Sequence, residues 1–206
     1  MKLSQRKLIK KLLLATLTAT TLVWFPTATQ AAQDVNPDSA SNNEVEVREE
    51  SYTINNITYP VSDNYNFVYG GGYESGSSPA FGNLIMIRGG YFNGIFGGMS
   101  MNSAYGNRII FNGGTVSGGL IGGASIFYGS GTGGDVYNNT VDINGGTIAN
   151  VSGGEIAYGY LTNSSTPNYS SALGNVYGNT VNVTGGYISN GITGGAALGG
   201  TLTATT

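Results

Sequence analysis

Apolar and polar residues alternate with a period of two in four related segments that follow residue 82. The apolar pairs are Ile85 and Ile87, Ile109 and Phe111, Val141 and Ile143, and Val181 and Val183. Alternate residues of a β-strand share one face, and branched side chains suit its pleated surface, so the pattern predicts strands rather than helices. A Gly-Gly pair follows each strand and predicts a sharp corner, because glycine adopts backbone angles that a Cβ atom excludes.

The four segments share the frame Asn-x-β-x-β-x-Gly-Gly-x-β, in which β is an apolar and usually branched residue. The copies begin at Asn83, Asn107, Asn139 and Asn179 and reach a second Gly-Gly pair after 16 or 17 residues. The connections between copies instead lengthen from 8 to 15 to 24 residues. Constant units with one variable connection are typical of a stacked solenoid. We therefore predict an all-β fold, a right-handed parallel β-helix of about four turns with Gly-Gly corners, over residues 82–206.

Two further sets of apolar residues recur at fixed offsets behind the first Gly-Gly pair of each copy. One set is Phe92, Val116, Ile148 and Ile188, and the other is Ile95, Leu120, Val151 and Ile192. Stacked turns would bring each set into a continuous inward column. The repeated asparagines have two interpretations: they hydrogen-bond to one another between successive turns, or they are four independent turn residues.

The first 31 residues form a separate segment. Five basic residues lie within residues 2–11, an apolar run follows over residues 12–25, and small residues come next. This order is typical of a secretory signal peptide, and an apolar run of about 14 residues is short for a membrane span. We predict cleavage between Ala31 and Ala32, and hence a secreted protein at the cell surface.

Two regions separate this segment from the repeats. Residues 32–51 are polar and acidic and have little with which to build a core, so we predict a spacer. Residues 52–81 contain short apolar stretches and predict the first strands and an N-terminal cap. Because Leu84, Met86 and Ile110 lie at outward positions of the early turns, we expect the first part of the cap, residues 52–69, to cover them.

The composition limits the chemistry that the chain can perform. It has 35 glycines and 14 tyrosines, but no cysteine and no histidine. Without residues 1–31 it keeps three arginines and eleven acidic residues, a net charge of 3 − 11 = −8. An acidic surface repels phosphate backbones, so nucleic acid is not an expected partner. The absence of cysteine excludes disulfides and thiolate chemistry.

Catalysis would need carboxylates, arginine, tyrosine or a metal held by oxygen ligands. Asp142, with Arg108 one repeat earlier, is a weak catalytic candidate, and a charge pair on the outer face is the interpretation that we favour. Residues 129–135 are out of frame for a calcium-binding repeat and favour a loop. We therefore predict no enzymatic activity, no cofactor and no metal site.

The leader, the acidic segment and the Asn-x-Val-x-Ile-x-Gly-Gly-x-Ile repeats resemble the N-terminal part of bacterial autotransporter passenger domains and related repetitive surface adhesins. The resemblance covers about residues 67–206 and rests on the strand-Gly-Gly-strand frame. It implies export to the outer membrane by a C-terminal β-barrel and a role in adhesion, aggregation or biofilm formation. Because the sequence ends at Thr206 without such a barrel, we expect these residues to be a fragment of a longer product.

Aromatic residues in the variable connections are the candidate binding residues. They are Phe127, Tyr128, Tyr158, Tyr160 and Tyr169. Tyrosine offers contact area at a small entropic cost, and loops on one side of a rigid coil can grip a glycan, a surface protein or a second copy. The alternative is that these rings pack back onto the coil. We therefore predict a secreted adhesive or structural surface domain, with a β-helical carbohydrate-active enzyme, similar to polysaccharide lyases, and a non-binding stalk as alternatives.

Overall fold

The computed structural model describes residues 32–60, 64–72, 78–127, 133–158, 174–197 and 201–202. These residues belong to one compact unit, Ala32–Thr206, which is separate from the unit Met1–Ala31. The described residues form β-strands and turns and contain no helix. No membrane-spanning helix is therefore present among them.

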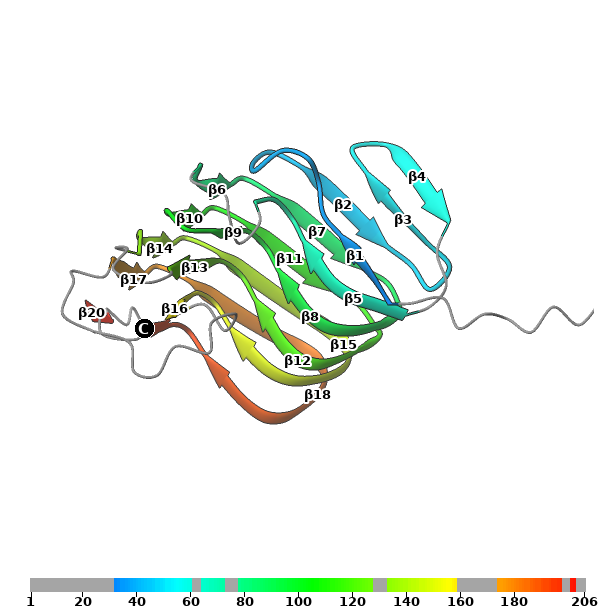
Figure 1. Cartoon of the computed structure of the whole chain (residues 1–206). Coiled ribbons are helices and arrows are strands. Elements are labelled where there is room, and N and C mark those ends of the chain that lie inside the picture. Colours follow the sequence, from blue (N-terminus) through cyan, green and yellow to red (C-terminus); the bar gives the residue numbers. More distant parts are fainter. Residues whose placement is uncertain are drawn as a thin grey trace, which may run out of the picture. The chain divides into compact units, whose positions relative to one another are not determined.

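Each sequence repeat forms one layer of strands, and the layers lie one behind another (Figure 1). Layer 1 contains β6 (Ala80–Phe81), β7 (Leu84–Ile87), β8 (Tyr91–Phe96) and β9 (Met99–Ser100). Layer 2 contains β10 (Ala104–Tyr105), β11 (Arg108–Phe111), β12 (Thr115–Ile121) and β13 (Ala124–Phe127). Layer 3 contains β14 (Val136–Tyr137), β15 (Thr140–Ser152) and β16 (Glu155–Tyr158). Layer 4 contains β17 (Asn175–Tyr177), β18 (Thr180–Thr193) and β19 (Ala196–Ala197), and β20 (Thr201–Leu202) pairs with β17.

The layers are joined by parallel strand pairing in three sheets. The largest sheet curls, because β15 pairs with β11 through its first half and with β12 through its second half. The order β6-β10-β14-β17-β20 makes the second sheet and β9-β13-β16-β19 the third. Pairing follows the repeat frame, so that Ile109 lies between Ile85 and Val141. The all-β prediction is confirmed, with mostly parallel strands in a curled sheet.

The predicted inward columns form the core of this curled sheet. Ile85, Ile109 and Val141 are fully buried, and so are Ile95 and Leu120 in the column behind the first Gly-Gly corner. Burying one such aliphatic side chain contributes roughly 1.5–3 kcal/mol, so each layer depends on its neighbours to cover its apolar face.

Glycine makes the corners that the sequence predicts. The second glycine of each first pair has a positive φ, with values of 115° at Gly90, 105° at Gly114, 83° at Gly146 and 92° at Gly186. Side chains with a Cβ atom disfavour this region, which explains why the frame requires glycine there.

A ladder of asparagines runs through the interior along the stack. We call it the Asn ladder; its members are Asn43, Asn83, Asn107, Asn139 and Asn179. Each side-chain Nδ2 donates to Oδ1 of the next member, at 2.9 or 3.0 Å, and the same Oδ1 accepts from the backbone N–H of the member before it. The second Nδ2 proton bonds to a backbone carbonyl, as in Asn139 to Ala104 at 3.0 Å. The hypothesis of asparagines bonded between turns is confirmed, and the alternative of independent turn residues is wrong.

The prediction of a spacer at residues 32–51 needs correction. The segment contributes β1 (Gln33–Val35) and β2 (Glu44–Val47), which pair in parallel with β5 (Asn64–Tyr69) and β7. Val45 and Val47 are fully buried. The reason is that Asn43-Glu-Val-Glu-Val47 repeats the Asn-x-β-x-β frame, with its glutamates at the outward positions.

The expected cap covers a different surface from the predicted one. An antiparallel hairpin of β3 (Ser51–Ile54) and β4 (Ile57–Pro60) extends the sheet beyond β2 and lies at one end of the stack (Figure 1). It therefore pairs with the free edge of β2 and does not fold over the outer face. Leu84, Met86 and Ile110 on that face are partly exposed.

Candidate functional site

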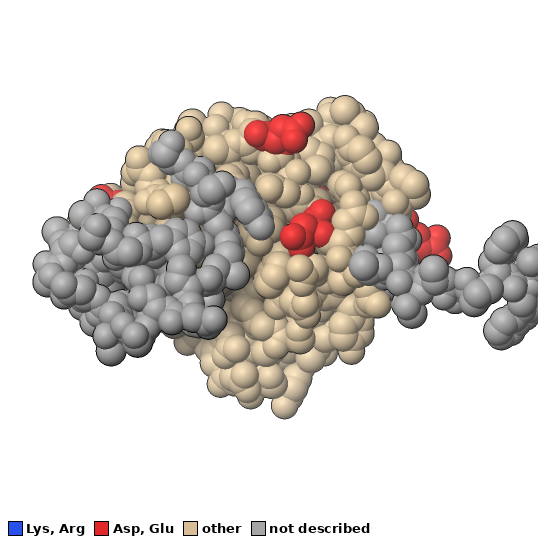
Figure 2. All heavy atoms as spheres, viewed as in Figure 1, with Lys and Arg blue, Asp and Glu red and all other residues tan. Residues whose placement is uncertain are grey.

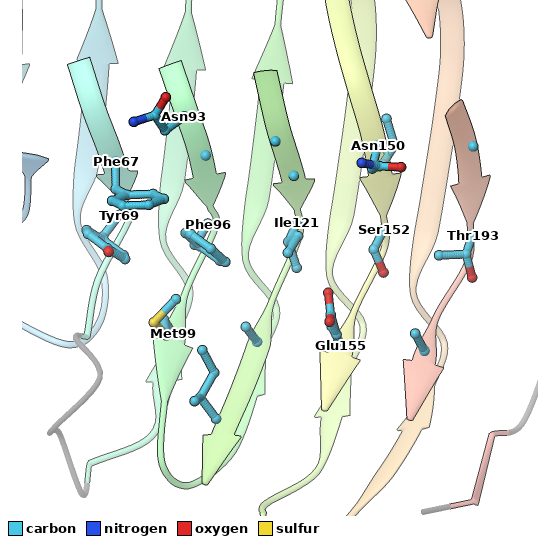
Figure 3. Close-up of a pocket in the computed structure, with 18 of the residues that line it drawn as sticks. Phe67, Tyr69, Asn93, Phe96, Met99, Ile121, Asn150, Ser152, Glu155 and Thr193 are labelled. Atoms are coloured by element: carbon cyan, nitrogen blue, oxygen red, sulfur yellow. The ribbon is translucent and has the colours of Figure 1, made fainter. Parts of the chain in front are cut away.

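A groove of about 740 Å³ crosses the strands at the second Gly-Gly corner of each layer. Its walls are the ends of β5, β8, β12, β15 and β18 on one side and the sheet of β9, β13, β16 and β19 on the other (Figure 3). Near β8 the lining side chains alternate with the inward column, so Phe96 faces the groove while the adjacent Ile95 is fully buried in the core. In the later layers Val151 and Ile192 of that column also line the groove. The groove therefore runs along the stack rather than along any one strand.

One end of the groove is aromatic. The rings of Tyr69 and Phe96 are stacked, with centroids 5.5 Å apart and planes at 11°, and Phe67 lies tilted at 6.2 Å from each. Met99 and Ile126 pack into the same apolar cluster. Offset aromatic pairs of this kind hold one another in place, which gives the end a fixed shape.

The other end of the groove is polar. It contains Asn150, Ser152, Glu155 and Thr193 (Figure 3). The hydroxyls of Ser152 and Thr193 donate to backbone carbonyls two residues ahead, at 2.9 and 2.7 Å. Burial raises the pKa of the Glu155 carboxyl above its ordinary value, because the charged form loses hydration.

Glycines keep the floor of the groove open. A Cβ atom at Gly94 would lie 3.1 Å from the Phe67 ring and 3.4 Å from the Phe96 ring, and would push into the aromatic end. At Gly191, by contrast, a Cβ atom would meet nothing within 4 Å. The floor is therefore tight at its aromatic end and spacious at its polar end.

A second aromatic feature runs along the sheet of β6, β10, β14 and β17. We call it the ring stack; it consists of Phe81, Tyr105, Tyr137 and Tyr177, with centroids 5.1, 4.8 and 5.0 Å apart and planes within 6° of parallel. Burial, the two neighbouring tyrosines and Asp135 together raise the pKa of Tyr137. Both faces of the Tyr105 and Tyr137 rings are covered by neighbouring rings, so these two residues present edges and hydroxyls rather than free faces to a ligand.

Two of the predicted binding aromatics lie on strands. Phe127 ends β13 and Tyr158 ends β16, and the two residues are partners in the parallel register. The variable connections that carry them therefore begin with strands of the third sheet and are not loops throughout. Tyr128, Tyr160 and Tyr169 lie outside the described residues, as does Ala31, while Ala32 is exposed.

Charged residues form pairs on the outer face. Arg108 Nε donates to Asp142 Oδ2 at 2.8 Å across β11 and β15, which is the outer-face pair that the sequence favours. Burial alone would raise the pKa of Asp142, but hydrogen bonds from Asn182 and Arg108, with the charge of Arg108, bring it below its ordinary value. Hydrogen bonding from Arg88, with help from Arg48, similarly lowers the pKa of Glu46 despite its partial burial.

No metal-binding cluster of acidic side chains occurs within the described ranges. Among the described residues on the face that it presents, Figure 2 shows separate acidic residues and no arginine. The three described arginines all pair with Glu46 or Asp142, while most of the described carboxylates carry no ion pair.

The fold and these features define an all-β protein of stacked parallel layers. Comparison of the chain with protein-family models, with curated proteins and with solved structures finds no match.

Proposed function

We propose that this chain is a secreted structural and adhesive domain of a bacterial surface protein, wound as a right-handed parallel β-helix. The observation that carries the proposal is the residue-for-residue parallel pairing of successive repeats, with an unbroken Asn ladder between them. Such stacking gives a rigid rod that grows by one layer per repeat. Stiffness and regular presentation of side chains are the properties that a surface adhesin or spacer needs.

The proposal gives residues 1–31 the role of a secretion signal. The compact unit begins at Ala32, which supports cleavage between Ala31 and Ala32. Attachment to the outer membrane would come from a C-terminal barrel elsewhere in the gene product. N-terminal sequencing of the secreted protein should read from Ala32, and a mature protein that retains residues 1–31 would contradict this part of the proposal.

Adhesion is assigned to the connections between layers, which differ in length while the layers keep a constant frame. The partner is a glycan, a surface protein or a second copy of the chain. Replacing residues 159–173 by a short Gly-Ser linker should abolish binding of displayed protein to cells, while the β-sheet signal in circular dichroism is unchanged. Replacing residues 128–132 in the same way tests the connection that carries Tyr128, and should also weaken binding. Wild-type binding by both variants would leave a non-binding stalk as the better description.

The handedness of the coil has its own test. An experimentally phased crystal structure should show right-handed winding, with one sequence repeat per turn. Left-handed winding, or layers that do not close into a coil, would contradict the proposed right-handed β-helix. The proposed adhesive role of the connections would be unaffected.

A further inference from the structure

The groove changes character steadily from one layer to the next. Its first row of paired residues reads Tyr69, Phe96, Ile121, Ser152 and Thr193. A second row reads Met99, Ala124, Glu155 and Ala196. Figure 3 shows the rings at one end, with Asn93 beside them, and Asn150, Ser152, Glu155 and Thr193 toward the other end. The groove is therefore amphipathic along its length, with the polarity changing between layers 2 and 3.

Glu155 is the charged residue that lines the groove. Within the described ranges its carboxylate has no ion-pair partner, since Arg48 and Arg88 bond to Glu46 and Arg108 bonds to Asp142. A partly desolvated carboxylate without a counter-charge is unfavourable on its own and gains most from a cation. A ligand that matches this end of the groove therefore carries a positively charged group there.

The spacing between the two ends limits the length of an occupant. Phe67 and Tyr69 lie on β5, and three inter-strand steps through β8 and β12 lead to the layer of Glu155. At the usual strand separation, three steps amount to about 14 Å. The volume of about 740 Å³ is of the size that encloses a small ligand.

We infer that the groove binds an elongated amphiphile that carries a primary ammonium group at one end. The apolar tail lies along the gradient from Ile121 to the rings of Phe96 and Phe67, and the ammonium group donates to the Glu155 carboxylate. A fatty acid would place a carboxylate against Glu155, and a glycan would set many of its hydroxyls against the apolar cluster that contains Met99, Ile121 and Ile126. The inference concerns the described groove and does not depend on the adhesive function proposed above.

The test uses the full chain and three matched probes, n-decylamine, n-decanol and decanoate, as monomers in isothermal titration calorimetry. Decylamine should bind most tightly and decanoate most weakly. Glu155→Gln keeps the shape of the side chain and removes its charge, and should weaken decylamine binding by about tenfold or more, since a hydrogen bond to a charged group is lost. Decanol binding should be unchanged in this variant. Glu44→Gln removes the same charge from an exposed site on β2 and should affect neither probe.

A second variant examines the other end of the groove. Phe67→Ala should weaken decylamine and decanol binding by a similar factor, because both tails reach the rings. Circular dichroism spectra that match the wild type show that each variant is folded. Equal decylamine affinity in wild type and Glu155→Gln, or equal affinity for decylamine and decanoate, would overturn the inference.

Discussion

The two ends of the strand stack share one repeat frame but differ in what lies against them. At the N-terminal end, the β3–β4 hairpin pairs with β2, and Asn55 Nδ2 donates to the Oδ1 of Asn43 at 3.1 Å, which closes the Asn ladder. At the other end, no described strand pairs with the free edge of β18. Val45 and Val47 of β2 are fully buried, whereas Val183 of β18 is 45% exposed.

The contrast shows that a side chain in this fold is buried when a neighbouring layer covers it, and that the sequence of its own layer does not decide this. Ile143 and Val183 occupy the same position of the frame and are partners in the register, yet Ile143 is fully buried. In quasi-one-dimensional folds, stability is a sum of the layers and the interfaces between them. An interior layer has two interfaces and a terminal layer has one. Substitutions at equivalent positions should therefore have unequal effects.

The largest difference is expected in the Asn ladder. Asn139→Ala removes bonds to Asn107, Ala104 and Asn179 and leaves buried polar groups unsatisfied, so the free energy of unfolding should fall by about 3–5 kcal/mol. Asn179→Ala should cost less, about 2–3 kcal/mol, because it loses three side-chain bonds instead of four and lies partly exposed at the end of the stack. Urea denaturation of both variants measures the difference. Equal losses would mean that the ladder does not act as a chain of interfaces.

The apolar columns should show the same inequality. Ile143→Ala creates a cavity between two layers and should lower the free energy of unfolding by about 3 kcal/mol. Val183→Ala at the exposed end should lower it by less than about 1 kcal/mol, since much of that side chain is already in water. Thermal and urea unfolding report both values, and a large loss at Val183 would show that the end layer is covered in solution.

The ring stack extends the comparison to the second sheet. Tyr137 stacks on Tyr105 at 4.8 Å and on Tyr177 at 5.0 Å, so Tyr137→Ala removes two ring pairs. Its cost should be about 2 kcal/mol and should exceed the cost of Tyr177→Ala by about 1 kcal/mol, the contribution of one aromatic pair. Identical unfolding midpoints for the two variants would argue that stacking adds nothing to strand pairing.

The smallest effect is expected at the closed end. Asn55 has a φ of 48°, and its Oδ1 accepts from the Glu44 N–H at 2.8 Å. Asn55→Ala loses these bonds and strains the turn, and should cost about 1 kcal/mol. Asn55→Gly keeps the backbone angle without strain and should cost less. An equal loss in the two variants would place the contribution of Asn55 in its side chain alone.

The sequence predicted the repeat geometry well because that geometry is local. The period-two pairs, the corner glycines and the inward columns follow from a frame that is visible in the aligned repeats. The structure confirms the columns in layers 1 to 3, whereas Val183 and Ile192 of layer 4 are exposed. The layer at Asn43 was missed because its corner carries Glu49 and Glu50 in place of Gly-Gly. The Asn-x-Val-x-Val match alone could have revealed it.

The ring stack was also within reach of sequence reasoning. An aromatic residue stands two positions before each of the ladder residues Asn83, Asn107, Asn139 and Asn179. The groove was not, because it joins residues as distant as Phe67 and Thr193 through the angle between two sheets. That angle is set by tertiary packing, and the periodicity of the sequence does not predict it.

The Asn ladder also gives the stack an electrical direction. Every bridging amide points its oxygen toward the preceding layer and its nitrogen toward the following one. Aligned amide dipoles add along a row, as they do along a helix, and each bond polarises the next. At the negative end of this row, the Oδ1 of Asn43 accepts a hydrogen bond from the Asn55 amide. The positive end lies at Asn179, so that end of the acidic protein favours an approaching oxygen atom.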